Sequence, residues 1–140
     1  MSIVKFNTSR QGSVFVNSGL DYPSGITVDS KGNLYVANNE NSTIMRFDST
    51  GHGGLYANSR VGVSGPAGLA IDNNDNLYVA NFNNDSVLRF DAEGNVSTFA
   101  SGNYPQGATG IAVQIPEPAT ALLVIIGLLS LCGAFRQKQQ

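Results

Sequence analysis

The sequence has very few of the side chains that usually carry chemistry. A single cysteine, Cys132, excludes an internal disulfide and any zinc site built from several thiolates. The only histidine, His52, has no histidine or acidic partner in its turn-like loop, so we expect an exposed turn residue. Only 13% of the 140 residues are charged, and the formal net charge is −2. This balance excludes the clustered basic surface that nucleic-acid binding requires.

Glycine and asparagine are abundant instead. The chain contains 16 Gly and 15 Asn, the two residues that best tolerate positive φ and build tight turns. They alternate with runs rich in Val, Ile, Tyr and Phe, which favour β-strands. Together they predict short strands joined by frequent turns.

A long internal repeat organises the first three quarters of the chain. Residues Gly25–Gly51 align with Gly68–Gly94 without a gap, and 13 of the 27 positions are identical. The repeat period is therefore 43 residues. Four-stranded β-propeller blades have periods of roughly 40–50 residues, so each repeat predicts one blade.

Each repeat unit contains four strand-like runs separated by Asp-containing turn signals. The expected strands are 25–28, 33–37, 43–47 and 54–57 in the first unit, and 68–71, 76–80, 86–90 and 96–100 in the second. Residues 3–7 and 12–19 repeat the last two strands, and 110–113 begins another first strand. We therefore predict an all-β fold of about two and a half four-stranded blades, an incomplete propeller with full units at about 25–67 and 68–109. A β-sandwich or a short solenoid is the alternative.

Several repeated features are those of one propeller family. Each unit has Pro-x-Gly-(Ile/Leu) at its start, an Asp after the first strand, the run Asn-Leu-Tyr-Val-Ala-Asn and an Asn-rich turn. In these features the chain resembles the NHL-repeat β-propellers. The resemblance implies that residues 1–114 form NHL-like propeller blades.

The C-terminal region has a different composition. Residues 119–135 form an apolar run of 17, which as a helix would span about 26 Å, slightly less than a hydrocarbon core of roughly 30 Å. We predict one transmembrane helix there; a buried core helix is the alternative. Arg136 and Lys138 follow directly, and basic residues beside a membrane span favour the cytoplasm. The blades should then lie outside.

A short proline motif precedes the apolar run. Pro116-Glu117-Pro118 disfavours helix until its second proline has passed, and so leaves a stiff, extended segment beside the membrane. This motif, the apolar helix and the basic end resemble the PEP-CTERM sorting signal of Gram-negative bacteria, over residues 115–140. The resemblance implies recognition by an exosortase-type membrane protease, removal of the tail, delivery to the cell surface or matrix, and a link to biofilm formation. A permanent single-pass anchor is the alternative.

The number of predicted blades is below that of a closed ring. Closed propellers have about four to eight blades, whereas this sequence supplies two full units, a half unit and one further strand. No signal peptide precedes the first repeat in this sequence. We expect either further blades and a secretion signal upstream of Met1, or ring closure by association of two or more copies.

The expected inner strands carry little catalytic potential. They offer Thr27, Ala70 and Ala112, which are poor metal ligands and poor bases. The repeated Asp29 and Asp72 follow strand ends, where aspartate usually forms a turn. We therefore predict no catalytic residue, no cofactor and no metal site.

One segment has partial similarity to a calcium loop. Asp72 to Asn76 supplies alternating oxygen ligands, but Leu77 stands where a Gly should turn and Asn83 where a bidentate Glu should bind. The turn interpretation is favoured over a calcium site.

These observations favour an exported surface protein whose propeller binds protein or exopolysaccharide without catalysis. The alternative is the C-terminal fragment of a propeller enzyme of the lactonase or lyase type, whose catalytic residues lie in upstream blades. A decayed gene without function is a third interpretation.

Overall fold

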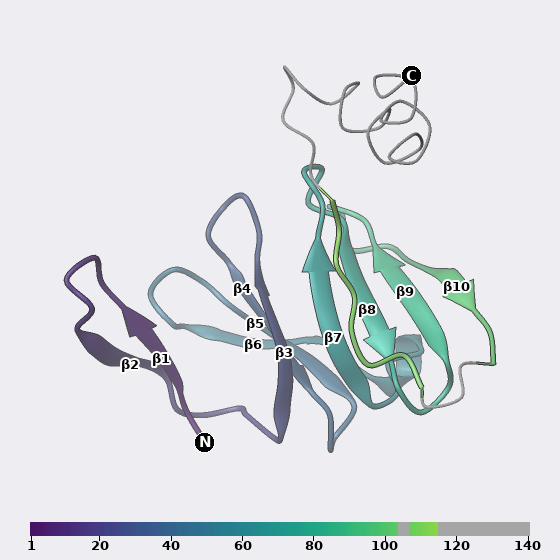
Figure 1. Cartoon of the computed structure of the whole chain (residues 1–140), viewed down its shortest axis with the longest axis horizontal. Helices are drawn as coiled ribbons and strands as arrows, with labels where there is room; N and C mark the ends of the chain where they lie inside the picture. Colours follow the sequence, from purple (N-terminus) through teal and green to yellow (C-terminus); the bar gives the residue numbers. More distant parts are fainter. Residues whose placement is uncertain (104–106, 115–140) are drawn as a thin grey trace, which may run out of the picture.

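The computed structural model describes residues 1–103 and 107–114, which form three antiparallel sheets arranged side by side like blades (Figure 1). We name the two-stranded sheet the hairpin and the two four-stranded sheets blade 1 and blade 2. The hairpin contains β1 (Ile3–Phe6) and β2 (Gly12–Val16). Blade 1 contains β3 (Pro23–Val28), β4 (Leu34–Asn38), β5 (Thr43–Phe47) and β6 (Gly53–Ala57). Blade 2 contains β7 (Pro66–Ile71), β8 (Leu77–Asn81), β9 (Ser86–Phe90) and β10 (Val96–Ser101).

The prediction of an all-β, partial propeller is confirmed for these residues. A single turn of 3₁₀ helix, η1 (Ser59–Val61), interrupts the strands. Within residues 1–103 and 107–114, no helix is long and apolar enough to cross a membrane. The predicted helix 119–135 lies outside the described residues.

Both blades are up-and-down meanders with the same register. Tyr35 on β4 pairs with Arg46 on β5, and Tyr78 pairs with Arg89 in the same way 43 residues later. Residues 43 positions apart therefore point to the same face of their blades, and each pair has a similar surrounding in the two blades. The hairpin has the arrangement of the two outer strands of a blade, as the similarity of residues 3–7 to 44–48 and of residues 12–19 to 94–102 predicts.

Two apolar clusters hold the sheets together. The larger lies between blades 1 and 2, and the smaller lies between the hairpin and blade 1. Ile44 and Val79 are completely buried in the larger cluster, and Val36 is almost completely buried in the smaller one. Burial of each such side chain contributes about 1.5–3 kcal/mol. Blade 1 is therefore held on both faces.

The prediction of a first strand at 110–113 is wrong, because these residues are not a β-strand, although they lie where the first strand of a next blade would lie. These residues run beside β7, where Gly110 approaches Gly68 just as Gly68 approaches Gly25 (Figure 1). They form no β-ladder. A first strand pairs with the second strand of its own blade, and the described residues contain no such partner.

A five-residue aspartate turn closes most of the hairpins at one end of the blades, which we call the turn end. In the turn 29–33, the Asp29 carboxylate accepts hydrogen bonds from the backbone N–H of Lys31 and Asn33, at 3.0 and 2.8 Å. Asp72 accepts from Asn74 and Asn76 in the same pattern, both at 2.9 Å. The predicted turn-forming role of Asp29 and Asp72 is confirmed.

A buried asparagine fastens each blade at the opposite end, which we call the connection end. Asn81 is fully buried, accepts a hydrogen bond from the Ser64 N–H and donates to the Gly62 carbonyl. Asn38 makes the equivalent bonds to Asp21 and Gly19. The last residue of the second strand therefore holds the loop that leads into its own blade.

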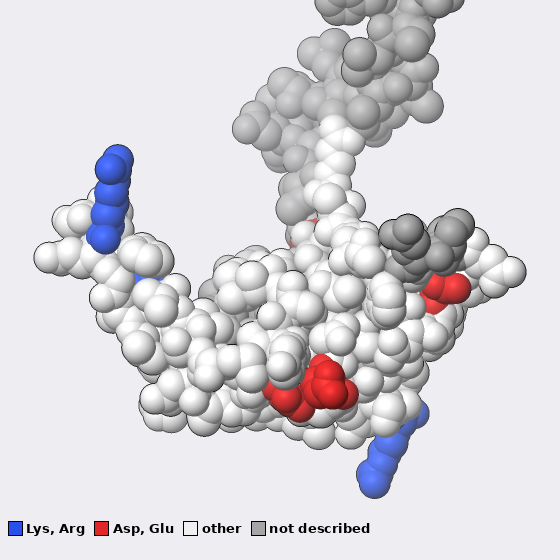
Figure 2. Space-filling model, turned by 60° about the horizontal axis from the view of Figure 1, so that its bottom comes forward, with Lys and Arg blue, Asp and Glu red and all other residues white. Residues whose placement is uncertain are grey.

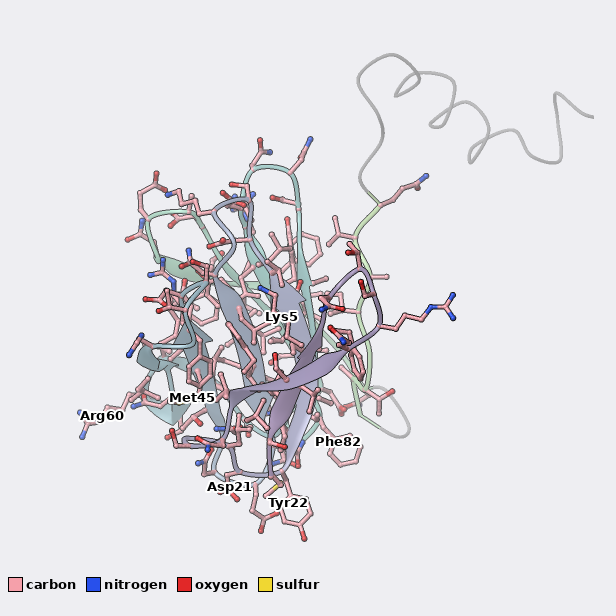
Figure 3. All side chains as sticks on the ribbon, turned by 90° about the vertical axis from the view of Figure 1, so that its left-hand side faces the viewer. Lys5, Asp21, Tyr22, Met45, Arg60 and Phe82 are labelled. Atoms are coloured by element: carbon pink, nitrogen blue, oxygen red, sulfur yellow. The ribbon has the colours of Figure 1, made fainter. Side chains whose placement is uncertain are left out.

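Charged groups are sparse at the connection end. Figure 2 shows this end with isolated acidic and basic side chains on a largely uncharged surface. Figure 3 places Asp21, Tyr22 and Phe82 together at this end, with Arg60 projecting from η1 at its edge.

Candidate functional site

The candidate site is a polar pocket of about 130 Å³ that opens between blade 1 and blade 2 at the turn end. A second pocket of about 360 Å³, on blade 1, shares Arg46 and Tyr56 with it. Both blades contribute to the first pocket, so it exists only because two repeats pack together. Its lining consists of Asp29, Lys31, Tyr35, Arg46, Tyr56, Asp75, Leu77 and residues 91–94.

A group of aromatic rings forms the floor of this site. Tyr35 on β4 and Tyr56 on β6 meet edge to face with ring centroids 5.1 Å apart. Tyr56 also contacts Phe90 of blade 2 at 5.5 Å, which joins the floor to the neighbouring blade. The Arg46 guanidinium lies 5.9 Å from the Tyr35 ring centroid, within cation–π range. The cation is thus held over the aromatic floor by its strand register.

Both phenols remain protonated at neutral pH. Burial raises the pKa of Tyr35 to about 12, with Arg46 opposing the shift and Asp29 adding to it. Burial also raises the pKa of Tyr56, where Arg46 again opposes the shift and Asp91 adds to it. The Tyr35 hydroxyl donates to the Asp29 carboxylate at 3.4 Å, so the site offers a ligand the Tyr56 hydroxyl as a donor, together with the permanent cation of Arg46.

Three of the four carboxylates around the pocket already accept hydrogen bonds. Burial raises the pKa of Asp29, but hydrogen bonds from Asn33, Lys31 and Tyr35 outweigh it and lower the pKa. Hydrogen bonds from Asn95 and Glu93 lower the pKa of Asp91. Asp75 accepts from the Ser30 N–H at 2.9 Å and from the Ser30 hydroxyl. These carboxylates serve turns and the blade interface. The lowered pKa values of Asp29 and Asp91 make these two carboxylates weak bases.

Arg46 differs from its repeat equivalent. The Arg89 guanidinium donates to the Asn76 side-chain oxygen at 2.9 Å. In the described part of the chain, the Arg46 guanidinium and the Tyr56 hydroxyl make no hydrogen bond. Their donors are therefore free to meet a ligand.

The sequence predictions did not find this site. Arg46 and Arg89 stand in the same Arg-Phe-Asp run, so the repeat itself gives no reason to distinguish them. The distinguishing signal is Tyr56, because the equivalent position in blade 2 is Phe99.

The residues singled out from sequence lie elsewhere. Pro116, Glu117, Pro118, Arg136 and Lys138 lie outside the described residues. His52 is exposed in its turn, with Nδ1 2.7 Å from the Thr50 hydroxyl, as predicted.

The same holds for candidate metal ligands. Among residues 1–103 and 107–114, no group of three or more His, Cys, Asp or Glu side chains could hold a metal ion. The Asp72 carboxylate, considered above for calcium, is used by the backbone and side chain of Asn76 and by Tyr78.

Comparison with known families identifies the repeat. The family model described as NHL repeat matches residues 20–47 and 64–90. These two segments are NHL repeats. They correspond closely to the first three strands of blades 1 and 2.

Solved structures show that blades of this shape belong to propellers. A streptogramin B lyase superposes with a TM-score of 0.68 at 18% identity, covering 79% of this chain and 37% of the lyase. The virginiamycin B lyase from Staphylococcus aureus gives 0.66 at 23% identity, covering 80% and 39%. A calcium-binding protein, regucalcin, from Agrobacterium tumefaciens gives 0.64 at 18% identity, covering 79% and 39%.

This chain spans less than two fifths of the length of each of these proteins. At such identities the similarity shows a propeller fold and leaves the activity open. Comparison with curated protein sequences gives no match.

Proposed function

We propose that this chain is an exported, non-catalytic propeller module that binds a cell-surface polysaccharide at the pocket between its NHL blades. The observation that carries the proposal is the free Arg46 guanidinium beside the free Tyr56 hydroxyl, in a pocket where three of the four carboxylates already accept hydrogen bonds. Such a site presents hydrogen-bond donors to a ligand without a poised base.

The chemistry of the pocket favours a sugar over a folded protein. A sugar ring offers many hydroxyl and ring oxygens that accept hydrogen bonds from guanidinium and phenol groups. The pocket is small and lies between two blades, so a protein surface could enter it only with a protruding side chain. Binding of an exposed protein loop is the remaining alternative, and the experiment below separates the two.

Affinity electrophoresis of the full-length chain in mild detergent would test the pocket. Gels containing alginate, dextran or no polysaccharide should distinguish acidic, neutral and absent ligands. We expect retardation by at least one polysaccharide and roughly a 10- to 150-fold loss of affinity on Arg46→Ala, because one charge-assisted contact contributes about 1.5–3 kcal/mol. Arg60→Ala removes the same charge from η1 and should bind like the wild type. Equal retardation of Arg46→Ala and wild type, or no retardation at all, would reject this site.

The export proposal is supported by the tail sequence. Residues 115–140 combine the Pro116-Glu117-Pro118 motif, an apolar run and a basic end in the order of a PEP-CTERM signal. We propose that an exosortase-type protease reads this signal, so that the blades pass from the inner membrane, with the C-terminus cytoplasmic, to the cell surface.

Expression in a Gram-negative host that contains an exosortase would test the sorting step, with the chain placed behind a secretion signal. We expect a shortened product in the surface fraction. Glu117→Ala with Pro116→Ala should keep the full-length chain in the membrane, whereas Gln139→Ala should not. Retention of the wild type and both variants at full length in the membrane would instead indicate a permanent anchor.

A fragment of a propeller enzyme is the second candidate. The lyase structures that share this fold favour it, although the similarity extends to the fold alone. Sequencing in frame upstream of Met1 would test this candidate: further blades with His and Glu on their inner strands would support it, whereas further blades without such residues would favour the binding module.

A further inference from the structure

We propose that the chain binds an internal stretch of a linear polysaccharide, which lies in a groove along the outer strand of blade 1. The groove begins at the candidate site at the turn end and continues between blades 1 and 2 towards η1. Its lining comes from these two blades and the connection between them, all of which the structure describes. The inference rests on the proposed function and adds the form of ligand that the site recognises.

Tyr56 on β6 is the residue at which three cavities meet. The polar pocket of about 130 Å³ and the pocket of about 360 Å³ both have Tyr56 in their lining. A further cavity of about 210 Å³, which we call the rim cavity, is lined by β6 and by Phe90 and Val96 of blade 2. It shares Tyr56 with both pockets, Gly94 with the polar one and Leu55 with the larger one. The three cavities are therefore neighbours around one side chain.

The rim cavity extends the candidate site along the length of β6. This strand leaves the turn end at Gly53 and reaches the connection end at Ala57, where Asn58 and η1 follow. Its five residues cover roughly 17 Å. In the other direction, the polar pocket reaches the aspartate turn at Asp29. A ligand that fills all three cavities is thus extended, and it passes Tyr56 without ending there.

The sizes of the cavities favour one extended ligand. Pockets for small molecules usually measure about 300–1,000 Å³. The polar pocket and the rim cavity, at about 130 and 210 Å³, are each smaller than this, whereas the three adjoining cavities together lie within the range. A polysaccharide that occupies them in succession therefore gains contacts that a single sugar unit lacks.

Asn58 supplies the rim cavity with a hydrogen-bond donor. Its side-chain oxygen accepts a hydrogen bond from the Arg60 N–H at 3.0 Å and so caps η1. In the described part of the chain, its amide nitrogen makes no hydrogen bond. Because the cap holds the side chain in place, this nitrogen is a positioned donor in the lining of the cavity. The groove therefore has donors along its whole length, with Arg46 at the turn end, the Tyr56 hydroxyl in the middle and Asn58 beside η1.

The rest of the rim cavity is apolar. Leu55, Val61 and Val96 line it with exposed side chains. Among the described residues, no charged side chain lines it, and the Arg60 side chain lies outside its lining. Apolar walls with a few placed polar groups are usual in sites for small molecules. They match a sugar ring, which combines apolar C–H faces with hydroxyl groups.

The donors of the groove differ from the equivalent residues of the second repeat. Tyr56 corresponds to Phe99, and Asn58 corresponds to Ser101, each 43 positions later. The framework of a blade does not require tyrosine or asparagine at these positions, because blade 2 forms without them. Their polar groups are therefore available to a ligand.

Oligosaccharides of graded length would test the inference. Size-fractionated oligomers, from the monosaccharide upwards, are prepared from whichever of alginate and dextran retards the full-length chain, and they compete with that polysaccharide in the affinity gel. Affinity is expressed per sugar unit, which removes the statistical advantage of a longer ligand. We expect it to rise about tenfold or more up to the length that fills the groove and then to level off, because only longer ligands gain the further hydrogen bond and apolar contacts.

Two variants that exchange residue types between the repeats would locate the groove. Asn58→Ser takes the residue type of Ser101, and serine still caps a helix. It should weaken the binding of long oligomers by roughly 2- to 12-fold, as expected for one neutral hydrogen bond, and leave monosaccharide binding unchanged. The matched variant Asn73→Ser takes the residue type of Ser30, lies outside the groove and should bind every length like the wild type.

The outcomes separate this inference from the proposed function. Equal affinity per unit for the monosaccharide and for long oligomers, with binding still weakened by Arg46→Ala, would overturn the groove and leave the sugar site in place. Equal losses on Asn58→Ser at every length would also overturn it, since they would indicate a structural role for Asn58. Absence of binding at any length would reject the proposed function and the groove together. The length series uses the wild type, so it decides the question even if a variant fails to fold.

Discussion

The backbone at Gly68 passes so close to Gly110 that a Cβ on Gly68 would lie 2.9 Å from the Gly110 Cα and 3.1 Å from the Ile111 nitrogen. The same approach joins Gly25 to β7, where a Cβ would lie 3.1 Å from the Leu69 nitrogen. Inner strands of successive blades converge on the propeller axis, and only glycine leaves room for the neighbouring backbone there. Glycine at this position of each repeat thus allows the inner strands of adjacent blades to approach closely.

Gly68→Ala should destabilise the fold by about 1–3 kcal/mol, since the added methyl group must displace backbone atoms of residues 110–111. Gly110→Ala is the matched control, because a Cβ there would meet no atom within 4 Å. Thermal melting of the full-length chain in detergent, followed by circular dichroism, would compare the two. Equal melting temperatures would show that residues 108–114 do not hold this position in solution.

Gly53 and Gly54 provide a second matched pair on β6. A Cβ on Gly53 would overlap the carbonyl oxygen of Arg46, whereas a Cβ on Gly54 would meet nothing within 4 Å. We expect Gly53→Ala to cost roughly 3 kcal/mol and to distort the strand that carries Tyr56. Gly54→Ala should change stability by less than about 0.5 kcal/mol. The same melting assay applies, and a stable Gly53→Ala variant would mean that β6 pairs differently with β5.

The Asn81 side chain should contribute strongly to stability for its size. Asn81→Ala removes a fully buried side chain and leaves the N–H of half-buried Ser64 without its partner, whereas water can reach the carbonyl of exposed Gly62. The expected loss is about 1–3 kcal/mol, from one unsatisfied group. Urea unfolding should show no comparable loss for Asn73→Ala, an exposed turn residue whose side chain makes no hydrogen bond in the described structure. Similar midpoints for both variants would contradict the proposed fastening role.

Tyr35 should make stability depend on alkaline pH. Its folded-state pKa is about 12, above the ordinary value of 10.0, so the unfolded chain loses this proton first. The contribution of the protonated phenol is fully present below pH 10 and is lost as the pH rises towards 12. Between these limits, wild type should lose stability more steeply than Tyr35→Phe, as measured by melting temperature against pH. Tyr22→Phe, at an exposed position, should follow the wild type; parallel curves for Tyr35→Phe and wild type would contradict the burial of this phenol.

The periodic part of the fold could be predicted from sequence because its determinants are local and occur twice. Asp29 and Asp72 each organise a turn within five residues, and alternating apolar residues then fix the strand faces. The strand predicted at 110–113 failed because a ladder depends on a partner strand, which the periodicity of one segment does not reveal. The order of the blades could be predicted as well, because each repeat unit forms one blade and successive units lie side by side.

The candidate site could not be predicted in the same way, because it depends on small departures from the repeat. Arg46 and Arg89 are both followed by Phe-Asp, yet in the described residues only Arg89 donates to the asparagine at this repeat position, Asn76. The difference arises where blade 2 covers Tyr35 and Tyr56, a tertiary contact that joins residues more than 30 positions apart. The exposure of Phe6 and Phe99 likewise depends on which sheets pack beside them. From residue type alone, both phenylalanines would be predicted to lie in the apolar core.

The aspartate turns and the buried asparagines recur with the same 43-residue period as the strands. The contacts that hold one blade therefore come from residues of that repeat and of the adjacent one. A gene that duplicates one such segment in tandem would therefore gain a working blade in a single event. Variation in exposed residues such as those at Lys31, Asn73 and Phe82 could then accumulate separately in each duplicate, while the inherited framework kept them at matching places around the axis.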